Sequence, residues 1–155
     1  MRRIELDKTD RKILALLQKN GRMTNNELSQ RINLSPSSSL RRVQRLEESR
    51  VISGYVALVL QEAVGRPTSI FVEVTLKSQS EESLKAFERA VPNCPDIMEC
   101  YLMSGDADYL IRVVAADAQD YERIHNQHLT RLPNVARIRS SFALRAICKK
   151  TALDV

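Results

Sequence analysis

The sequence predicts an α+β chain in two parts, with three short helices first and a sheet domain after them. Helical periodicity with capping signals extends from Asp7 to Glu48. A Gly and Pro pair then interrupts the pattern at Gly65-Arg66-Pro67. Beyond this break, apolar segments of strand and helix periodicity follow in the order strand, helix, strand, strand, helix, strand.

The first part has the start and stop signals of three helices, which we expect over residues 7–19, 24–32 and 35–48. Each begins with a side chain that can accept a hydrogen bond from the first turn, and the second begins with a Thr-x-x-Glu capping box. The capping residues are Asp7, Thr24 and Ser35. Pro36 stands at the first position of the third helix, where a missing N–H is harmless.

The third helix is the most informative feature of the first part. Ser38, Arg41, Arg42 and Arg45 are spaced i, i+3, i+4 and i+7, which places them on one face. We expect an opposite face to pack on the first two helices. Its apolar residues are Leu40, Val43 and Leu46. A short helix, a tight turn and a helix with an outer Arg and Ser stripe form a helix-turn-helix, which binds DNA.

In this arrangement the N-terminal end of the third helix points into the groove. Ser37, Ser38 and Arg41 are then the expected base contacts, and Arg22, Arg42 and Arg45 the expected phosphate contacts. The predicted DNA-binding residues are Arg22, Ser35, Ser37, Ser38, Arg41, Arg42 and Arg45. The alternative is a three-helix domain with a solvated charged face.

The charge distribution separates the two parts. Residues 1–60 carry 12 Lys and Arg against 6 Asp and Glu, whereas residues 61–155 carry 12 against 13. The whole excess of the +5 chain therefore lies in the first part. This favours contact of the first part with a polyanion, although a basic solvated surface would give the same count.

The second part predicts a βαββαβ, ferredoxin-like domain. Strands are expected over residues 68–77, 97–103, 109–115 and 135–146, and helices over 80–91 and 117–132. Two helices cover one face of such a sheet. The strands are apolar on both faces, so we expect a partner subunit to cover the other face.

The connection between the two middle strands contains Gly105-Asp106-Ala107-Asp108. Such a turn can present backbone N–H groups and carboxylates to a small zwitterion. Gly and Asp are also the residues that turns use most, so an ordinary turn remains the alternative.

Composition and spacing argue against other classes. The 43% hydrophobic and 28% charged residues are typical of a soluble globular protein and exclude large-scale disorder. Three Cys in no CxxC pair, no bilayer-length apolar stretch and no apolar signal-peptide core favour a reduced, cytoplasmic protein. A P-loop, a dinucleotide glycine motif and a nucleophile elbow are missing, so neither enzyme nor cofactor is expected.

No metal site is predicted either. Glu122, His125 and His128 are spaced i, i+3 and i+6 on a predicted helix, which indicates a solvated face rather than converging ligands. Cys94 and Cys100 do not have metal-ligand spacing.

Short motifs along nearly the whole chain resemble the Lrp/AsnC, or feast/famine, transcription regulators of bacteria. Those of the winged-type helix-turn-helix are Leu6-Asp-Lys-Thr-Asp-Arg-Lys-Ile13, Gly21-Arg22, Leu34-Ser-Pro-Ser37, Arg41-Arg-Val-Gln-Arg-Leu-Glu47 and Val51-Ile52. Those of the ligand-sensing domain are Gly105-Asp-Ala-Asp-Tyr-Leu110 and Ser140-Ser-Phe142. Three positions depart from the family pattern, namely Arg50 (usually Gly), Ala107 (often bulkier) and Ser140 (often Thr).

The resemblance implies homodimers that use the open sheet face and the linker near Tyr55 to Leu60, and octamers built from four dimers. It also implies an amino-acid effector bound between dimers near the Gly-Asp turn. The effector residues implied are Met103, Ser104, Gly105, Asp106, Asp108, Ser140 and Ser141.

We therefore expect a DNA-binding domain over residues 1–53, a linker strand over 54–66 and an effector-binding and oligomerisation domain over 67–155. The predicted function is a transcription regulator whose oligomeric state or DNA affinity responds to an amino acid. An architectural DNA-wrapping protein without an effector is the main alternative. Two further alternatives are an amino-acid-metabolising enzyme and an RNA-binding module. The sequence lacks the nucleophile–base or metal cluster that such an enzyme would need, and its strands have few aromatic residues to stack on RNA bases.

Overall fold

The computed structural model describes residues 5–155, so residues 1–4 of the predicted first domain lie outside it. The chain forms two compact units. The first runs up to Leu58 and also includes Ile147–Val155, and the second spans Val59–Ala146. Among residues 5–155, no helix combines the length and the apolar character that a bilayer crossing requires.

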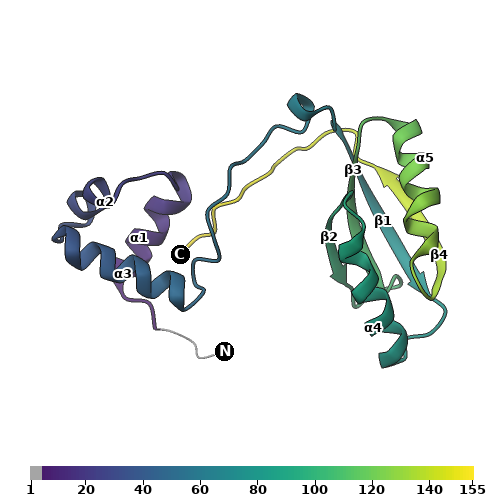
Figure 1. Ribbon diagram of the computed structural model, residues 1–155, viewed down its shortest axis with the longest axis horizontal. Helices are drawn as coiled ribbons and strands as arrows, with labels where there is room; N and C mark the ends of the chain where they lie inside the picture. The colour runs from purple at the N-terminus through teal and green to yellow at the C-terminus, as the bar shows by residue number, and fades with distance from the viewer. Residues whose placement is uncertain (1–4) are drawn as a thin grey trace. The chain divides into compact units, whose positions relative to one another are not determined.

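The first unit contains the three expected helices, α1 (Lys8–Lys19), α2 (Asn25–Ile32) and α3 (Pro36–Glu48) (Figure 1). The expected caps are in place, since the side chains of Asp7, Thr24 and Ser35 each accept a hydrogen bond from a backbone N–H three residues on. The small core consists of Ile13, Leu14, Leu28, Ile32 and Leu46.

The packing face of α3 differs from the predicted one. Leu40 is 46% exposed, whereas Ser39 is fully buried beside the core. At 100° per residue, Ser39 lies within about 20° of the buried Leu46, while Leu40 lies about 120° away from it. The helix therefore packs through a small side chain, and Leu40 is left on the outer surface.

The last residues of the chain belong to the first unit, although we predicted them in the second domain. The side-chain amide of Gln18 donates to the backbone oxygen of Leu153 (3.0 Å) and accepts from its N–H (2.7 Å). Residues 53–60 are extended and have no strand partner among the described residues. The predicted linker strand is therefore not paired within the described part of the chain.

The second unit is a ferredoxin-like domain. Its main elements are β1 (Thr68–Leu76), α4 (Glu81–Ala90), β2 (Ile97–Leu102), β3 (Tyr109–Ala115), α5 (Ala118–Gln127) and β4 (Val135–Phe142). The strands lie in the order β2-β3-β1-β4, and every neighbouring pair is antiparallel. Both helices cover the same face of the sheet (Figure 1). We expected one helix over residues 117–132. Instead, α5 ends at Gln127 and a separate 3-10 turn follows over Leu129–Arg131.

The two faces of this sheet differ in burial. Ile70, Val72 and Val74 alternate along β1 toward the helices and are fully buried with Phe87 in the larger core. The intervening Phe71 is 40% exposed on the other face. The second unit by itself therefore leaves the face opposite the helices open, and coverage of this face by a partner subunit stays a prediction.

Candidate nucleic-acid interface and effector pocket

Two of the predicted phosphate contacts on α3 are tied to α1. Arg42 donates to Asp7 (2.7 Å) and to Asp10 (2.8 Å), and Arg45 donates to the other oxygen of Asp10 (2.5 Å). The Asp10 side chain is fully buried. The carboxylates that cap α1 thus also fix the position of α3.

The charge of Asp7 depends on this arrangement. The backbone N–H of Asp10 and then the guanidinium of Arg42 lower the pKa of the Asp7 carboxyl to about 2. The carboxylate is therefore ionised at neutral pH. Arg42 and Arg45 position the third helix, and only the parts of their guanidinium groups that face away from Asp10 remain available to a phosphate.

The outer face of α3 contains other side chains. Ser37, Leu40, Arg41 and Gln44 are exposed along successive turns. The Arg41 and Gln44 side chains border a shallow hollow shared with Arg42, Arg45 and Glu48. Arg forks onto guanine, Gln onto adenine, and an apolar side chain contacts the thymine methyl group. Sequence reasoning missed Leu40 and Gln44, because it assigned Leu40 to the core and followed the positive charges.

The remaining predicted DNA contacts fall into two groups. Ser35 and Ser38 are engaged in the cap of α3, where the Ser35 hydroxyl donates to that of Ser38 at 3.0 Å. Ser37 and Arg22 are exposed. Arg22 lies in the turn between α1 and α2, where its N–H donates to Asn20.

Arg50 follows α3 in a left-handed backbone conformation (φ 58°). This conformation costs a residue with a Cβ about 1 kcal/mol relative to Gly. The departure from the family pattern at this position therefore keeps the turn and adds strain to it.

The predicted effector turn is supported by a buried carboxylate. Asp108 accepts hydrogen bonds from the backbone N–H of Leu76 (2.7 Å) and from the Gln79 side chain (2.7 Å). Its side chain points into the domain, so both oxygens are already occupied. Asp108 holds the turn in place and does not face an effector.

The two serines of β4 point to opposite faces of the sheet. Ser140 pairs with the buried Val72, and its hydroxyl is hydrogen-bonded to Tyr121 of α5. Ser141 pairs with Phe71 on the open face. Alternation along a strand is the cause, and it leaves Ser140 on the helix-covered face of the sheet, away from Ser141.

A pocket of about 260 Å³ lies on the open face beside the turn. Its lining residues are Glu73, Met103, Gly105, Asp106, Ala107, Leu110 and Arg139. Met103 and Leu110 are apolar, whereas Arg139 forms an ion pair with Glu73 at 2.7 Å. The exposed Ser104 is not among the lining residues.

Sequence reasoning missed Glu73, Leu110 and Arg139. The signal was present in the strand alternation, because Glu73 and Leu110 alternate with buried residues in β1 and β3, and Arg139 lies between two half-buried residues of β4. The residues that pair across neighbouring strands were not known before the strand order was.

Two family models match the chain. A model described as Lrp/AsnC ligand binding domain covers residues 69–153, and one described as winged helix-turn-helix DNA-binding covers residues 6–53. Each model thus matches one of the two candidate sites with its supporting elements.

Relatives and solved structures agree with these models. The Bkd operon transcriptional regulator of Pseudomonas aeruginosa is 41% identical over 96% of this chain and 97% of its own. The leucine-responsive regulatory protein of Escherichia coli is 38% identical over 97% and 92%. The crystal structure of a transcriptional regulator from Neisseria meningitidis with L-Met is similar with a TM-score of 0.89 at 36% identity, covering 96% of each chain. The chain belongs to the Lrp/AsnC family of transcription regulators, with a DNA-binding helix-turn-helix and a ligand-binding domain.

Proposed function

We propose that this regulator reads specific DNA sequences through the outer face of α3 and that an amino acid bound by the second unit changes its DNA affinity or oligomeric state. The observation that carries the proposal is the pocket at the Gly-Asp turn, which combines charges of both signs with apolar walls. A zwitterion with an apolar side chain has the matching chemistry.

On the DNA side, Arg41 is the central contact of the proposal. It is exposed in the middle of α3, and Ser37 and Gln44 lie one turn before and after it. Arg42 and Arg45 contribute mainly by holding α3 on Asp10. Arg22 and Ser37 are the proposed flanking contacts.

On the effector side, the carboxylates of Glu73 and Asp106 suit an ammonium group, and the guanidinium of Arg139 suits a carboxylate. Met103 and Leu110 offer an apolar wall for a side chain. Two relatives support this chemistry through their names, since one is leucine-responsive and another was solved with L-Met.

We also propose that the chain assembles into homodimers, and that four dimers form an octamer. The segment before Gln61 exposes a run of apolar side chains, with Val56 84% and Leu58 73% exposed. The open sheet face adds Phe71 and Tyr101. Apolar surface of this extent needs a partner, and a second copy brings the same surface.

The test is fluorescence anisotropy of the full-length protein on duplex DNA from upstream of its own gene, with a random duplex as control. Binding is measured at two salt concentrations and with each common amino acid added. We expect specific binding that one or a few amino acids change. Arg41→Ala should weaken it about tenfold, whereas Arg11→Ala, at an exposed position of α1, should weaken it much less.

Gly105→Leu separates sensing from DNA binding. Apart from its chain neighbours, no heavy atom of residues 5–155 lies within 4 Å of a Cβ placed on Gly105, so a larger side chain has room beside the pocket. We expect the amino-acid response to disappear while DNA affinity remains. Specific binding that no amino acid alters would favour an architectural role, and equal affinity for both duplexes would refute sequence-specific reading.

A further inference from the structure

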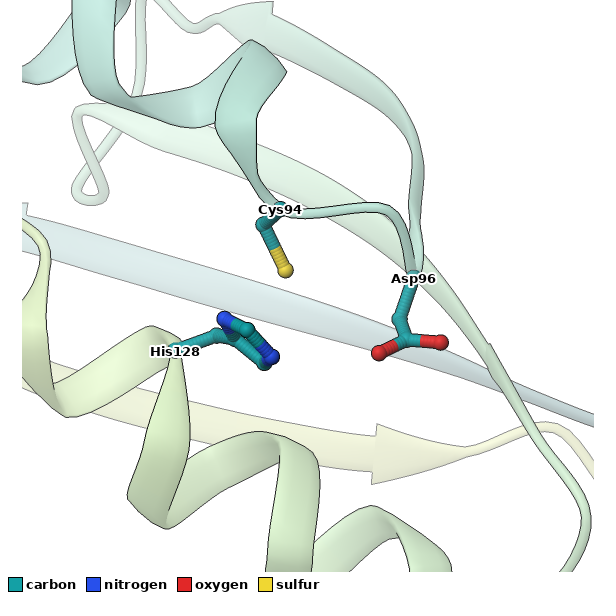
Figure 2. A group of neighbouring side chains, drawn as sticks. All are labelled: Cys94, Asp96 and His128. Carbon is teal, nitrogen blue, oxygen red and sulfur yellow. The ribbon is translucent and has the colours of Figure 1, made fainter.

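Three side chains that can bind a metal meet at one end of the sheet domain. The sulfur of Cys94, a carboxylate oxygen of Asp96 and a ring nitrogen of His128 all lie within 4.8 Å of one another. Figure 2 shows the Cys94 sulfur pointing into the space between the His128 ring and the Asp96 carboxylate. His128 comes from the end of α5, and the other two come from the connection between α4 and β2.

We propose that Cys94, Asp96 and His128 form a site for a borderline-soft divalent cation such as Zn²⁺. A thiolate, an imidazole and a carboxylate are the ligand types that zinc takes in proteins, and three of them leave a fourth position open. Ligand atoms around tetrahedral zinc lie about 3.3–3.6 Å apart, so the three side chains need to approach one another by only about 1 Å.

The backbone holds the three residues in place before any metal binds. Pro95 and Asp96 form a turn after Cys94, and this turn brings the side chains of Cys94 and Asp96 together. The backbone carbonyl oxygen of Cys94 accepts from the N–H of Ile97, and the backbone carbonyl oxygen of Asp96 accepts from the N–H of Val114. His128 donates its N–H to Ile124 and closes α5.

The ring of His128 is available as a ligand. Among residues 5–155, none forms a hydrogen bond with this ring, although it is half buried. The other histidine, His125, is occupied with Asn126 at 3.2 Å. The two histidines of α5 therefore differ in their surroundings and provide an internal control.

Burial of the Cys94 thiol works against metal binding, because a metal takes the thiolate. Burial raises the pKa of the thiol, while the backbone N–H groups of Asp96 and Ile97 act in the opposite direction. Without a metal the sulfur stays protonated and unreactive. A coordinating cation deprotonates such a thiol.

Two arginines limit the affinity and define how Asp96 is shared. Arg66 donates to one oxygen of Asp96, and Arg123 lies 3.7 Å from the other. The metal would take the second oxygen, leaving Arg66 as the outer partner that orients the carboxylate. Because both guanidinium groups repel a cation, we expect weaker binding than at a closed four-cysteine site.

The site is distinct from the effector pocket. Cys94 and Asp96 precede β2, whereas the Gly-Asp turn follows it, and a six-residue strand spans about 20 Å. Bound metal would join the end of α5 to the α4–β2 connection and stabilise the second unit. Metal binding at this site does not depend on which amino acid, if any, occupies the pocket.

The experiment is a titration of the reduced, chelator-treated full-length protein with Co²⁺, which reports a thiolate ligand through a near-ultraviolet charge-transfer band. We expect one Co²⁺ per chain, displaced by Zn²⁺. Cys94→Ser should abolish the band, and Cys100→Ser and Cys148→Ser should keep it.

His128→Gln should weaken Co²⁺ binding at least tenfold, and His125→Gln should leave it unchanged. Circular dichroism checks the fold of each variant, and His128→Gln decides the matter if Cys94→Ser does not fold. Absence of the band from the wild-type protein, its persistence in Cys94→Ser, or equal effects of the two histidine variants would each overturn the proposed site.

Discussion

The two units each place one buried carboxylate beneath a proposed binding surface, but the two carboxylates have different hydrogen-bond donors. In the first unit, Asp10 accepts hydrogen bonds from the side chains of Arg42 and Arg45. In the second, Asp108 accepts one from the backbone N–H of Leu76 and one from Gln79. Asp10 therefore orients α3 through two arginine side chains of that helix. Asp108 instead fixes the Gly-Asp turn by accepting from a backbone N–H at the end of β1.

This difference follows from the size of the cores. The first unit buries few large apolar side chains, so an ion-pair cluster adds to the forces that place α3 on α1. The second unit has a sheet core with many fully buried residues and needs polar contacts only where the chain turns. Stability and DNA reading should thus be linked more closely in the first unit than stability and effector binding in the second.

The largest effect should come from Asp10→Ala, which leaves two guanidinium groups without their buried partner. We expect the first unit to lose about 3 kcal/mol of unfolding free energy, with DNA binding lost in parallel. Hydrogen exchange measured by peptide should show faster exchange in α1 and α3 and no change in the sheet domain. If Asp10→Ala bound DNA as wild type, Asp10 would not be orienting α3.

Asp108→Ala should have the next largest effect, at about 2 kcal/mol, because the buried N–H of Leu76 loses its acceptor. Hydrogen exchange should rise at the end of β1 and around the Gly-Asp turn, with calorimetry showing weaker effector binding. DNA affinity without effector should stay near that of wild type. Asp108→Asn, which keeps an acceptor oxygen, should restore part of the loss.

The smallest expected effect is a loss of stability at low pH, caused by protonation of Asp7. Because the pKa of Asp7 is lowered from 3.8 to about 2, its contribution to stability is present above about pH 4 and is lost as the pH falls toward 2. NMR titration of the Asp7 carboxyl measures this pKa directly. Arg42→Ala should raise it only part of the way, since the backbone N–H of Asp10 is the larger cause. If the Asp7 pKa in Arg42→Ala returned to 3.8, Arg42 rather than the Asp10 N–H would be the main cause of the lowered pKa.

Much of the fold was predictable because its signals are local. The caps at Asp7, Thr24 and Ser35 depend on residues three positions apart, and all three are confirmed. The alternation along β1 identified its buried face, and the order of strands and helices identified the ferredoxin-like domain. The break near Gly65 coincides with a left-handed turn, where glycine is favoured.

The details of the sites depended on residues far apart in the sequence. Arg42 and Arg45 belonged to a charge stripe in the sequence, and only the packing of α3 on α1 turned them toward Asp10. His128 was assigned to a solvated helix face, yet the return of α5 over the sheet brings it to Cys94 and Asp96.

By itself, therefore, the sequence determined the elements, their order and the family, because caps, turns and periodicity act within a few residues. Tertiary structure decided which arginines of α3 are tied to Asp10, which serine of β4 lies on the open face and which histidine meets a cysteine. Hydrogen bonds and ion pairs form only between atoms within about 3–4 Å. For residues 30 or more positions apart, that proximity exists only once the helices and strands have packed.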